Sequence, residues 1–274
     1  MLICGSIQLS LFRPLVMGIV NVTPDSFSDG GQYLSSEAAI AHALHLIEAG
    51  ADIIDIGGES TRPGAVQVSL QQELDRVLPI IEGLRGSAAP ISIDTFKPQV
   101  MRAAIASGAQ MVNDVNALLD EESLQVVAQS KVAVCLMHKQ GDPQHMQVQP
   151  RYKNVVTEVR DFLRERVAAC AAAGIALDSI VIDPGFGFGK TVAHNYLLLA
   201  NLADLAELGV PVLAGLSRKA MLGAVTGQDV TQRTSASVAA ALIAVQRGAN
   251  IVRVHDVRAT VDALKVWYAV NGEA

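Results

Sequence analysis

The segment EAGADIIDIGGESTR, residues 48–62, holds the repeating unit that decides the fold of this chain. A helix-like stretch ends at Gly50, an apolar run follows at Ile53–Ile56, and the run stops at glycines and polar residues. A short run dominated by Ile and Val is typical of a strand that is buried on both faces of a parallel sheet. A glycine before it suits the left-handed position at which many helices end.

Seven further runs have the same form, and each stops at a polar or charged residue. In chain order the eight runs are Val16–Val20 before Asn21, Ile53–Ile56 before Gly57, Ile91–Ile93 before Asp94, Met111–Val112 before Asn113, Val132–Met137 before His138, Ile180–Ile182 before Asp183, Val212–Leu216 before Ser217, and Ile251–Val254 before His255. Polar groups gathered at the carboxyl ends of parallel strands indicate a site for a polar small molecule.

Helical patterns separate these runs. One predicted buried face is Ile40, Leu44 and Ile47, and a second consists of Leu74, Val77, Leu78 and Ile81. Ser69 and Gln72 have the spacing of a capping box. Gly50, Gly108 and Gly248 each end a helical stretch directly before a run.

Eight strand–helix units predict a single α/β domain over residues 1–274, folded as a (β/α)₈ TIM barrel, since such barrels have about 250 residues. An open doubly wound sheet is the alternative. Residues 2–12 alternate like a β-hairpin and are expected to form an N-terminal extension that closes the barrel bottom.

Composition narrows the class of protein. The formal net charge of −6 argues against nucleic acid as a partner. No apolar stretch reaches the ~18 residues of a membrane span, and residues 1–14 lack a secretory pattern. Cys4, Cys135 and Cys170 have neither pairing nor metal-ligand spacing, which favours a reduced, cytoplasmic setting.

Two polar loops follow the first two runs. The first, Asn21–Gly31, carries Phe27 among the oxygen ligands Asn21, Asp25 and Asp29, which suits a lid over a Mg²⁺-bound phosphate. The second, Gly57–Gly64, combines glycines, hydroxyls and Arg62, which suits an anion. An ordinary surface loop and a capped turn remain the alternative interpretations.

Acidic and amide residues follow three other strands. Asp94, Asn113 and Asp183 together predict a pocket for a flat heterocycle with a guanidine-like edge, which a carboxylate binds through two hydrogen bonds. Each could instead cap the following helix. The glycine-rich stretch Asp183–Thr191 matches neither a P-loop nor a dinucleotide fingerprint, so we interpret it as a flexible loop in which Phe188 offers a flat face.

The last two strands end in basic residues. Alternation places Arg253 and His255 on one side of their strand, at the barrel mouth, where the later loops of such barrels often hold phosphate. Ser217 and Lys219 follow the preceding strand. His138 is also at a strand end, but we assign it a structural role in packing.

These segments together resemble the dihydropteroate synthases of bacterial folate biosynthesis. The resemblance is carried, in order over almost the whole chain, by Asn21–Gly31, Asp55–Gly64, Ile93–Thr95, Val112–Asp114, Asp183–Lys190, Gly215–Lys219 and Arg253–Asp256. It implies a transferase that joins 6-hydroxymethyl-7,8-dihydropterin diphosphate to p-aminobenzoate, that sulfonamides target, and that forms a homodimer.

The same resemblance implies residue roles. Asp94, Asn113, Met137, Asp183 and Lys219 would bind the pterin, with Asp94, Lys219 and Asp183 as catalytic residues. Three further groups complete the site: Thr61, Arg62, Arg253 and His255 for the diphosphate; Phe27, Pro63, Phe188 and Ser217 for p-aminobenzoate; Asn21 and Asp29 for Mg²⁺.

Two rival functions stay open. A methyltetrahydrofolate-dependent methyltransferase would share the acidic pterin pocket but needs no Mg²⁺–diphosphate site. A non-catalytic pterin-binding paralogue would be expected to lose its phosphate ligands. Apolar residues near the C-terminus could cover the barrel or meet a second subunit: Leu264, Val266, Trp267 and Val270.

Overall fold

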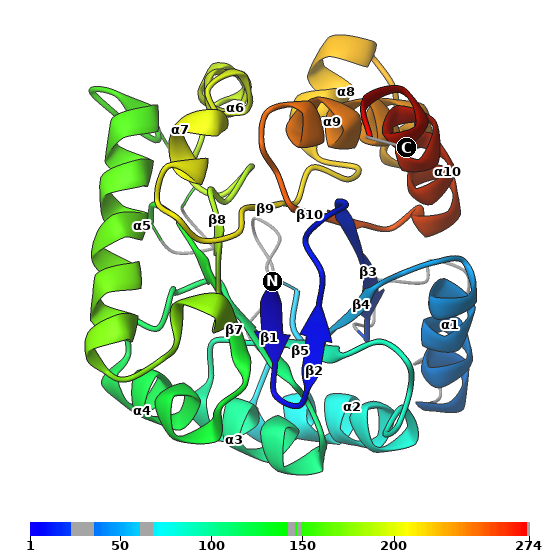
Figure 1. Cartoon of the computed structure of the whole chain (residues 1–274), viewed down its shortest axis with the longest axis vertical. Helices are drawn as coiled ribbons and strands as arrows, with labels where there is room; N and C mark the ends of the chain where they lie inside the picture. Colours follow the sequence, from blue (N-terminus) through cyan, green and yellow to red (C-terminus); the bar gives the residue numbers. More distant parts are fainter. Residues whose placement is uncertain (23–35, 61–67, 142–145, 147–148, 273–274) are drawn as a thin grey trace.

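A computed structural model describes residues 1–22, 36–60, 68–141, 146 and 149–272. Eight parallel strands form one sheet in the order β8-β7-β6-β5-β4-β3-β10-β9. A parallel bridge between Ile182 and Val212 joins the two ends of the sheet. The predicted (β/α)₈ barrel is therefore confirmed, and Figure 1 shows its ring of helices around the strands.

The barrel strands coincide with the eight predicted runs. They are β3 (Leu15–Asn21), β4 (Ile53–Gly57), β5 (Ile91–Asp94), β6 (Met111–Asp114), β7 (Ala133–Met137), β8 (Ile180–Asp183), β9 (Leu213–Ala214) and β10 (Ile251–Val254). The seventh run is longer than its strand, because β9 leaves the sheet before Gly215.

The helices lie outside the strands. They are α1 (Ser36–Glu48), α2 (Leu70–Gly83), α3 (Pro98–Ser107), α4 (Glu121–Ser130), α5 (Val155–Ala172), α6 (Val192–Ala200), α7 (Ala203–Ala206), α8 (Ala220–Thr226), α9 (Thr234–Gln246) and α10 (Val257–Asn271), with 3₁₀ turns η2 (Leu177–Ser179) and η3 (Val230–Gln232). Across the described ranges, none of these helices combines the length and the apolar character of a membrane span.

Local signals in the sequence set several helix ends as predicted. The Ser69–Gln72 capping box is present, with the Gln72 N–H donating to Ser69 Oγ over 3.3 Å and the Ser69 N–H to Gln72 Oε1 over 3.2 Å. Gly50, Gly108 and Gly248 have φ values of 102°, 120° and 97°, a region in which a side chain is strained. Each of these glycines therefore ends a helix in a turn that leads directly into the next strand.

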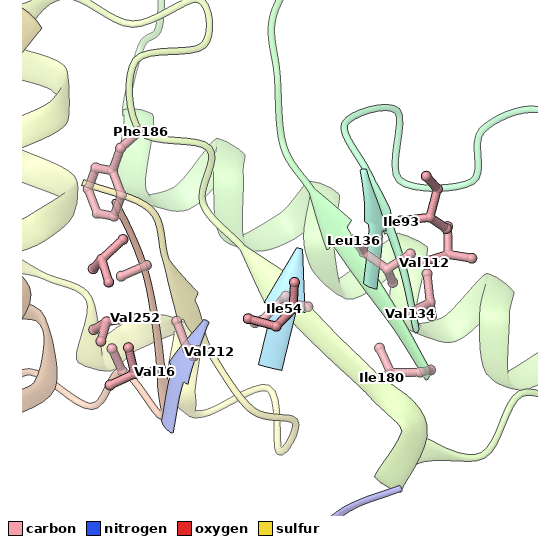
Figure 2. Packing of buried hydrophobic residues seen from close by; sticks show 14 of the residues in the cluster. Val16, Ile54, Ile93, Val112, Val134, Leu136, Ile180, Phe186, Val212 and Val252 are labelled. Atoms are coloured by element: carbon pink, nitrogen blue, oxygen red, sulfur yellow. The ribbon is translucent and has the colours of Figure 1, made fainter. Parts of the chain in front are cut away.

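Alternation along the strands separates two apolar cores. Outward residues pack beneath the helices, and Figure 2 shows Val16, Ile54 and Val252 among them. Inward residues fill the barrel, namely Leu15, Met17, Ile53, Met111, Ala133, Cys135, Val181, Leu213 and Ile251. Side chains of a strand alternate between its two faces, so the residue two positions after each of these inward residues also points into the barrel, closer to the carboxyl end of the strand.

The hairpin predicted at the N-terminus is confirmed. Strands β1 (Leu2–Cys4) and β2 (Ile7–Leu9) pair antiparallel. Leu2 and Cys4 are fully buried in the inner core with the first inward residues of the barrel strands. The hairpin thus covers the amino-terminal end of the barrel, and in Figure 1 it lies over the centre of the ring. The carboxyl-terminal end is the mouth.

The second predicted helix face is confirmed, since Val77 and Ile81 are fully buried. The first, on α1, is confirmed in part: Ile40 and Ile47 are half-buried and pack against the core, whereas Leu44 is 45% exposed. The fully buried residues of α1 are Ala39, Ala43 and Leu46. Helix α1 approaches β3 closely at Gly18, where a Cβ would lie 3.1 Å from Leu46 Cδ1. A helix this close to a strand leaves little space between the two backbones, so small side chains such as Ala39 and Ala43 fill most of the interface.

Candidate active site

The polar residues at the mouth continue the inward rows of the barrel. Asp55 is two residues beyond Ile53, Asn113 two beyond Met111, Asp183 two beyond Val181, and Arg253 two beyond Ile251. Each strand therefore places an apolar side chain inside the barrel and a polar one above it.

Arg253 joins two buried carboxylates. Its Nε donates to Asp55 Oδ2 over 2.6 Å, and its Nη2 donates to Asp94 Oδ2 over 2.7 Å. Asn113 Nδ2 donates to the same Asp55 oxygen over 3.0 Å. Burial raises the pKa of Asp94, although the charge of Arg253 opposes it. Among the described residues, Asp55 Oδ1 and Asp94 Oδ1 have no hydrogen-bond partner, so both oxygens can accept from a ligand.

Asp183, Lys219 and Arg253 converge around Gly215. A Cβ on Gly215 would lie 3.8 Å from Asp183 Oδ2, 4.0 Å from Lys219 Nζ and 3.9 Å from Arg253 Cβ. Burial raises the pKa of Asp183 and lowers that of Lys219 to about 8, while the opposite charge of each partner opposes the shift. The acidic and basic residues predicted from separate strands thus share one site.

Met137 lies next to Asp183. It ends β7 in register with Asp183 on β8 and is almost fully buried. The Cγ atom of Met137 would be 3.2 Å from a Cβ on Gly185, in the loop after β8. Its thioether therefore lines the mouth beside the carboxylate, as an apolar wall for a ring would require.

The loop after β8 presents Phe188 to Lys219. Lys219 Nζ lies 4.8 Å from the centroid of the Phe188 ring and donates to the Phe186 carbonyl. The loop is anchored through its carbonyls, since the buried Lys190 donates to those of Gly185 and Phe188 over 2.9 and 3.1 Å. His138 is buried and contacts Lys190, which agrees with its predicted structural role.

Ser217 and His255 contact each other at the mouth. The His255 N–H donates to Ser217 Oγ over 3.2 Å, and His255 Nδ1 lies 3.0 Å from the same oxygen. Next to them, Arg218 forms a two-pronged ion pair with Asp256, with distances of 3.1 and 2.7 Å. The predicted diphosphate residue His255 and the predicted p-aminobenzoate residue Ser217 are therefore neighbours.

Asn21, the predicted metal ligand at the end of β3, also faces the mouth. A Cβ on Gly57 would lie 3.6 Å from both Asn21 Oδ1 and Asp94 Cβ. An amide oxygen fits Mg²⁺ as one hard ligand. Within the described ranges, no group of three or more His, Cys, Asp or Glu residues is arranged so that it could hold a metal ion. The other predicted residues lie outside these ranges: Phe27, Asp29, Thr61, Arg62 and Pro63.

Asp55 is the site residue to which sequence reasoning gave no role. It is fully buried and bonds to both Arg253 and Asn113. Alternation could have identified it, because Asp55 stands between the outward residues Ile54 and Ile56 and two positions before the end of β4.

Comparison with known proteins points to one family. The model of the pterin binding enzyme family matches residues 17–255. Dihydropteroate synthase of Neisseria meningitidis serogroup C is 52% identical over 272 residues, which cover 97% of this chain and 96% of that protein. The structure of Xanthomonas albilineans dihydropteroate synthase with 4-aminobenzoic acid is 57% identical, with a TM-score of 0.93, and covers 99% of this chain and 98% of its own.

A further structure of the Xanthomonas albilineans enzyme, in complex with 7,8-dihydropteroate, is 53% identical with a TM-score of 0.89, covering 99% of this chain and 98% of its own. Both the family match and the full-length identity include the strands that form the mouth. The chain belongs to the dihydropteroate synthase family of pterin-binding enzymes.

Proposed function

We propose that this enzyme joins 6-hydroxymethyl-7,8-dihydropterin diphosphate to p-aminobenzoate, giving 7,8-dihydropteroate and pyrophosphate. The observation that carries this proposal is the convergence of Asp183, Lys219 and Arg253 around Gly215, with Asp94 bonded to Arg253. Related enzymes with 4-aminobenzoic acid and with 7,8-dihydropteroate support both the second substrate and the product.

The pterin occupies the acidic side of the mouth. Asp183 binds its amino-pyrimidine edge, because a carboxylate matches two parallel N–H donors. The free Oδ1 of Asp94 accepts from the ring, and Asn113, Lys219 and Met137 complete the pocket. Phe188 and Ser217 frame p-aminobenzoate, together with Phe27 and Pro63.

The diphosphate is bound by Arg253 and His255, together with Thr61 and Arg62. The C–O bond between the pterin methylene group and the diphosphate breaks first, and its electron pair leaves with the oxygen. The carboxylates of Asp94 and Asp183 lie in the described mouth and would stabilise a pterin-methyl cation. The amine of p-aminobenzoate then forms the C–N bond and loses a proton.

Mg²⁺, a homodimer and a cytoplasmic location complete the proposal. Asn21, with Asp29, would hold Mg²⁺, which would offset the charge that develops on the diphosphate. The exposed residues Val266 and Val270 on α10 support a subunit contact, being 68% and 78% exposed, whereas Leu264 is buried in the core.

A pyrophosphate-release assay tests the function directly. The purified enzyme is mixed with the pterin diphosphate, with and without p-aminobenzoate and with Mg²⁺ or a chelator. Steady-state pyrophosphate release that requires p-aminobenzoate and is reduced by the chelator supports the proposal. Absence of release with both substrates and Mg²⁺ contradicts the function. A methylene-carbon isotope effect typical of a tight, concerted displacement would instead overturn the order of the steps.

A further inference from the structure

Lys190 is a buried lysine for which the proposed chemistry has no use. Lys190 is only 2% exposed, yet its Nζ atom has four acceptors within hydrogen-bond distance. These are Gly185 O at 2.9 Å, Phe188 O at 3.1 Å, His138 Nδ1 at 2.9 Å and His138 O at 3.3 Å. A lysine is rarely buried to this degree without a specific arrangement of partners.

The partners of Lys190 come from two neighbouring strand ends. His138 follows β7, whereas Gly185 and Phe188 belong to the loop after β8. The loop is packed against the backbone after β7 so closely that a Cβ on Gly185 would lie 1.9 Å from the His138 carbonyl oxygen. Lys190 therefore joins both segments through its Nζ atom.

His138 is suited to accept from this lysine. Burial, and then the charge of Lys190, lowers the pKa of His138 to about 3, so its ring is neutral near pH 7. The ring also packs edge-on against Phe162, with centroids 5.0 Å apart, which fixes its orientation. The His138 ring is thus a stationary acceptor on the β7 side.

Two lysines therefore hold the same loop. Lys190 bonds to the carbonyls of Gly185 and Phe188, while Lys219 bonds to the intervening carbonyl of Phe186 and lies over the Phe188 ring. We infer that Lys190 is a positioning residue that holds the Phe188 ring against Lys219 and so shapes the binding face for p-aminobenzoate. The assignment of this substrate to Phe188 rests on the proposed function.

The test compares Lys190→Met with a matched control, Tyr152→Phe. Methionine retains most of the aliphatic stem but removes every donor. Tyr152 donates one hydrogen bond of 2.8 Å to Gly189 O, so its removal affects the same loop without touching the Lys190 contacts. Lys190→Gln retains two N–H donors, should show a smaller effect in the same direction, and serves as the test if Lys190→Met does not fold.

The first readout is independent of activity. The protein is labelled with 4-fluorophenylalanine, and the Phe188 signal is assigned by its loss in Phe188→Leu. We expect the ¹⁹F signal of Phe188 to shift or broaden in Lys190→Met and to stay close to the parent position in Tyr152→Phe. An unchanged Phe188 signal in Lys190→Met and Lys190→Gln overturns the inference, whatever the kinetics show.

The second readout separates positioning from general damage. A misplaced ring should raise KM for p-aminobenzoate about tenfold or more, with a much smaller change in KM for the pterin diphosphate. Equal losses for both substrates, or a lower Tm with unchanged KM values and an unchanged Phe188 signal, overturn the positioning role. A displaced Phe188 signal with an unchanged KM for p-aminobenzoate overturns the assignment of that substrate to Phe188, whereas failure of the proposed function itself would appear as absence of pyrophosphate release in the parent enzyme.

Discussion

Lys219 shows how one side chain acquires its properties from its surroundings. Its ammonium group bonds to the Phe186 carbonyl, lies over the Phe188 ring and is near Asp183. An exposed lysine would stay protonated well above neutral pH, but burial lowers the pKa of Lys219 to about 8. The charge of Lys219 therefore titrates just above physiological pH.

This titration predicts an alkaline limit to activity. Below about pH 8 Lys219 carries its proton and can donate to the pterin, whereas above it the proton is lost. We expect kcat/KM to fall about tenfold for each further pH unit, since kcat/KM reports the free enzyme. Steady-state rates from pH 6 to 10 measure the profile.

Two variants control for other titrating groups. Lys219→Met should have lower activity and no alkaline limb, while Lys265→Met, which changes an exposed lysine on α10, should retain the parent profile. An alkaline limb that persists in Lys219→Met would refute the assignment.

A buried ion cluster connects several elements next to the mouth. Lys97, the residue before α3, donates to Glu59 after β4, to Glu73 of α2 over 2.5 Å and to the Val68 carbonyl over 2.9 Å. Thr95 Oγ1 donates to Glu73 over 2.6 Å. The side chains of Glu59 and Glu73 are only 7% and 1% exposed, so both carboxylates depend on Lys97 for compensation.

Removal of this cation should cost substantial stability. We expect Lys97→Met to lower the free energy of unfolding by about 3–5 kcal/mol, because two buried carboxylates would lose the cation that pairs with both among the described residues. Arg102→Met is the control, since the Arg102–Glu122 pair is exposed and should contribute at most about 1 kcal/mol. Urea denaturation measures both. A Lys97→Met variant no less stable than Arg102→Met would contradict this account.

The whole molecule is a barrel with two different ends. The hairpin covers the amino-terminal end with Leu2 and Cys4. The carboxyl-terminal end contains the buried charged residues of the site, among them Arg253, Asp55 and Asp94. Because the inner core continues into the hairpin, we expect the hairpin to contribute to global stability although it is outside the barrel sheet.

To test this contribution, we compare the same leucine-to-alanine substitution at a buried position of the hairpin and at an exposed position elsewhere. Leu2→Ala removes a fully buried side chain and should lower the free energy of unfolding by about 2–5 kcal/mol. Leu119→Ala changes a leucine that is 61% exposed and should alter it by at most about 0.5 kcal/mol. Chemical denaturation with a single transition is the measurement; similar effects of both changes would show that the hairpin is not part of the cooperative unit.

Much of the architecture could be read from local patterns. The eight apolar runs identified the strands, and the glycines at 50, 108 and 248 marked the helix ends. The exposure of Leu44 on α1 could not be predicted in this way, because the centre of the buried face depends on how closely that helix approaches Gly18 of another element. The anchoring of the loop after β8 was missed for a similar reason: Lys190 finds His138, which lies 52 residues away in the chain.

The sequence by itself determined which residues line the barrel and which of them end at the mouth, since a period of two along each strand is a local property. Only the tertiary structure decided the partners: Arg253 pairs with Asp55 and Asp94, which are 198 and 159 residues away in sequence. Coulomb and hydrogen-bond energies depend on distance through space and on burial. These distances and this burial arise only when the strands close into a barrel.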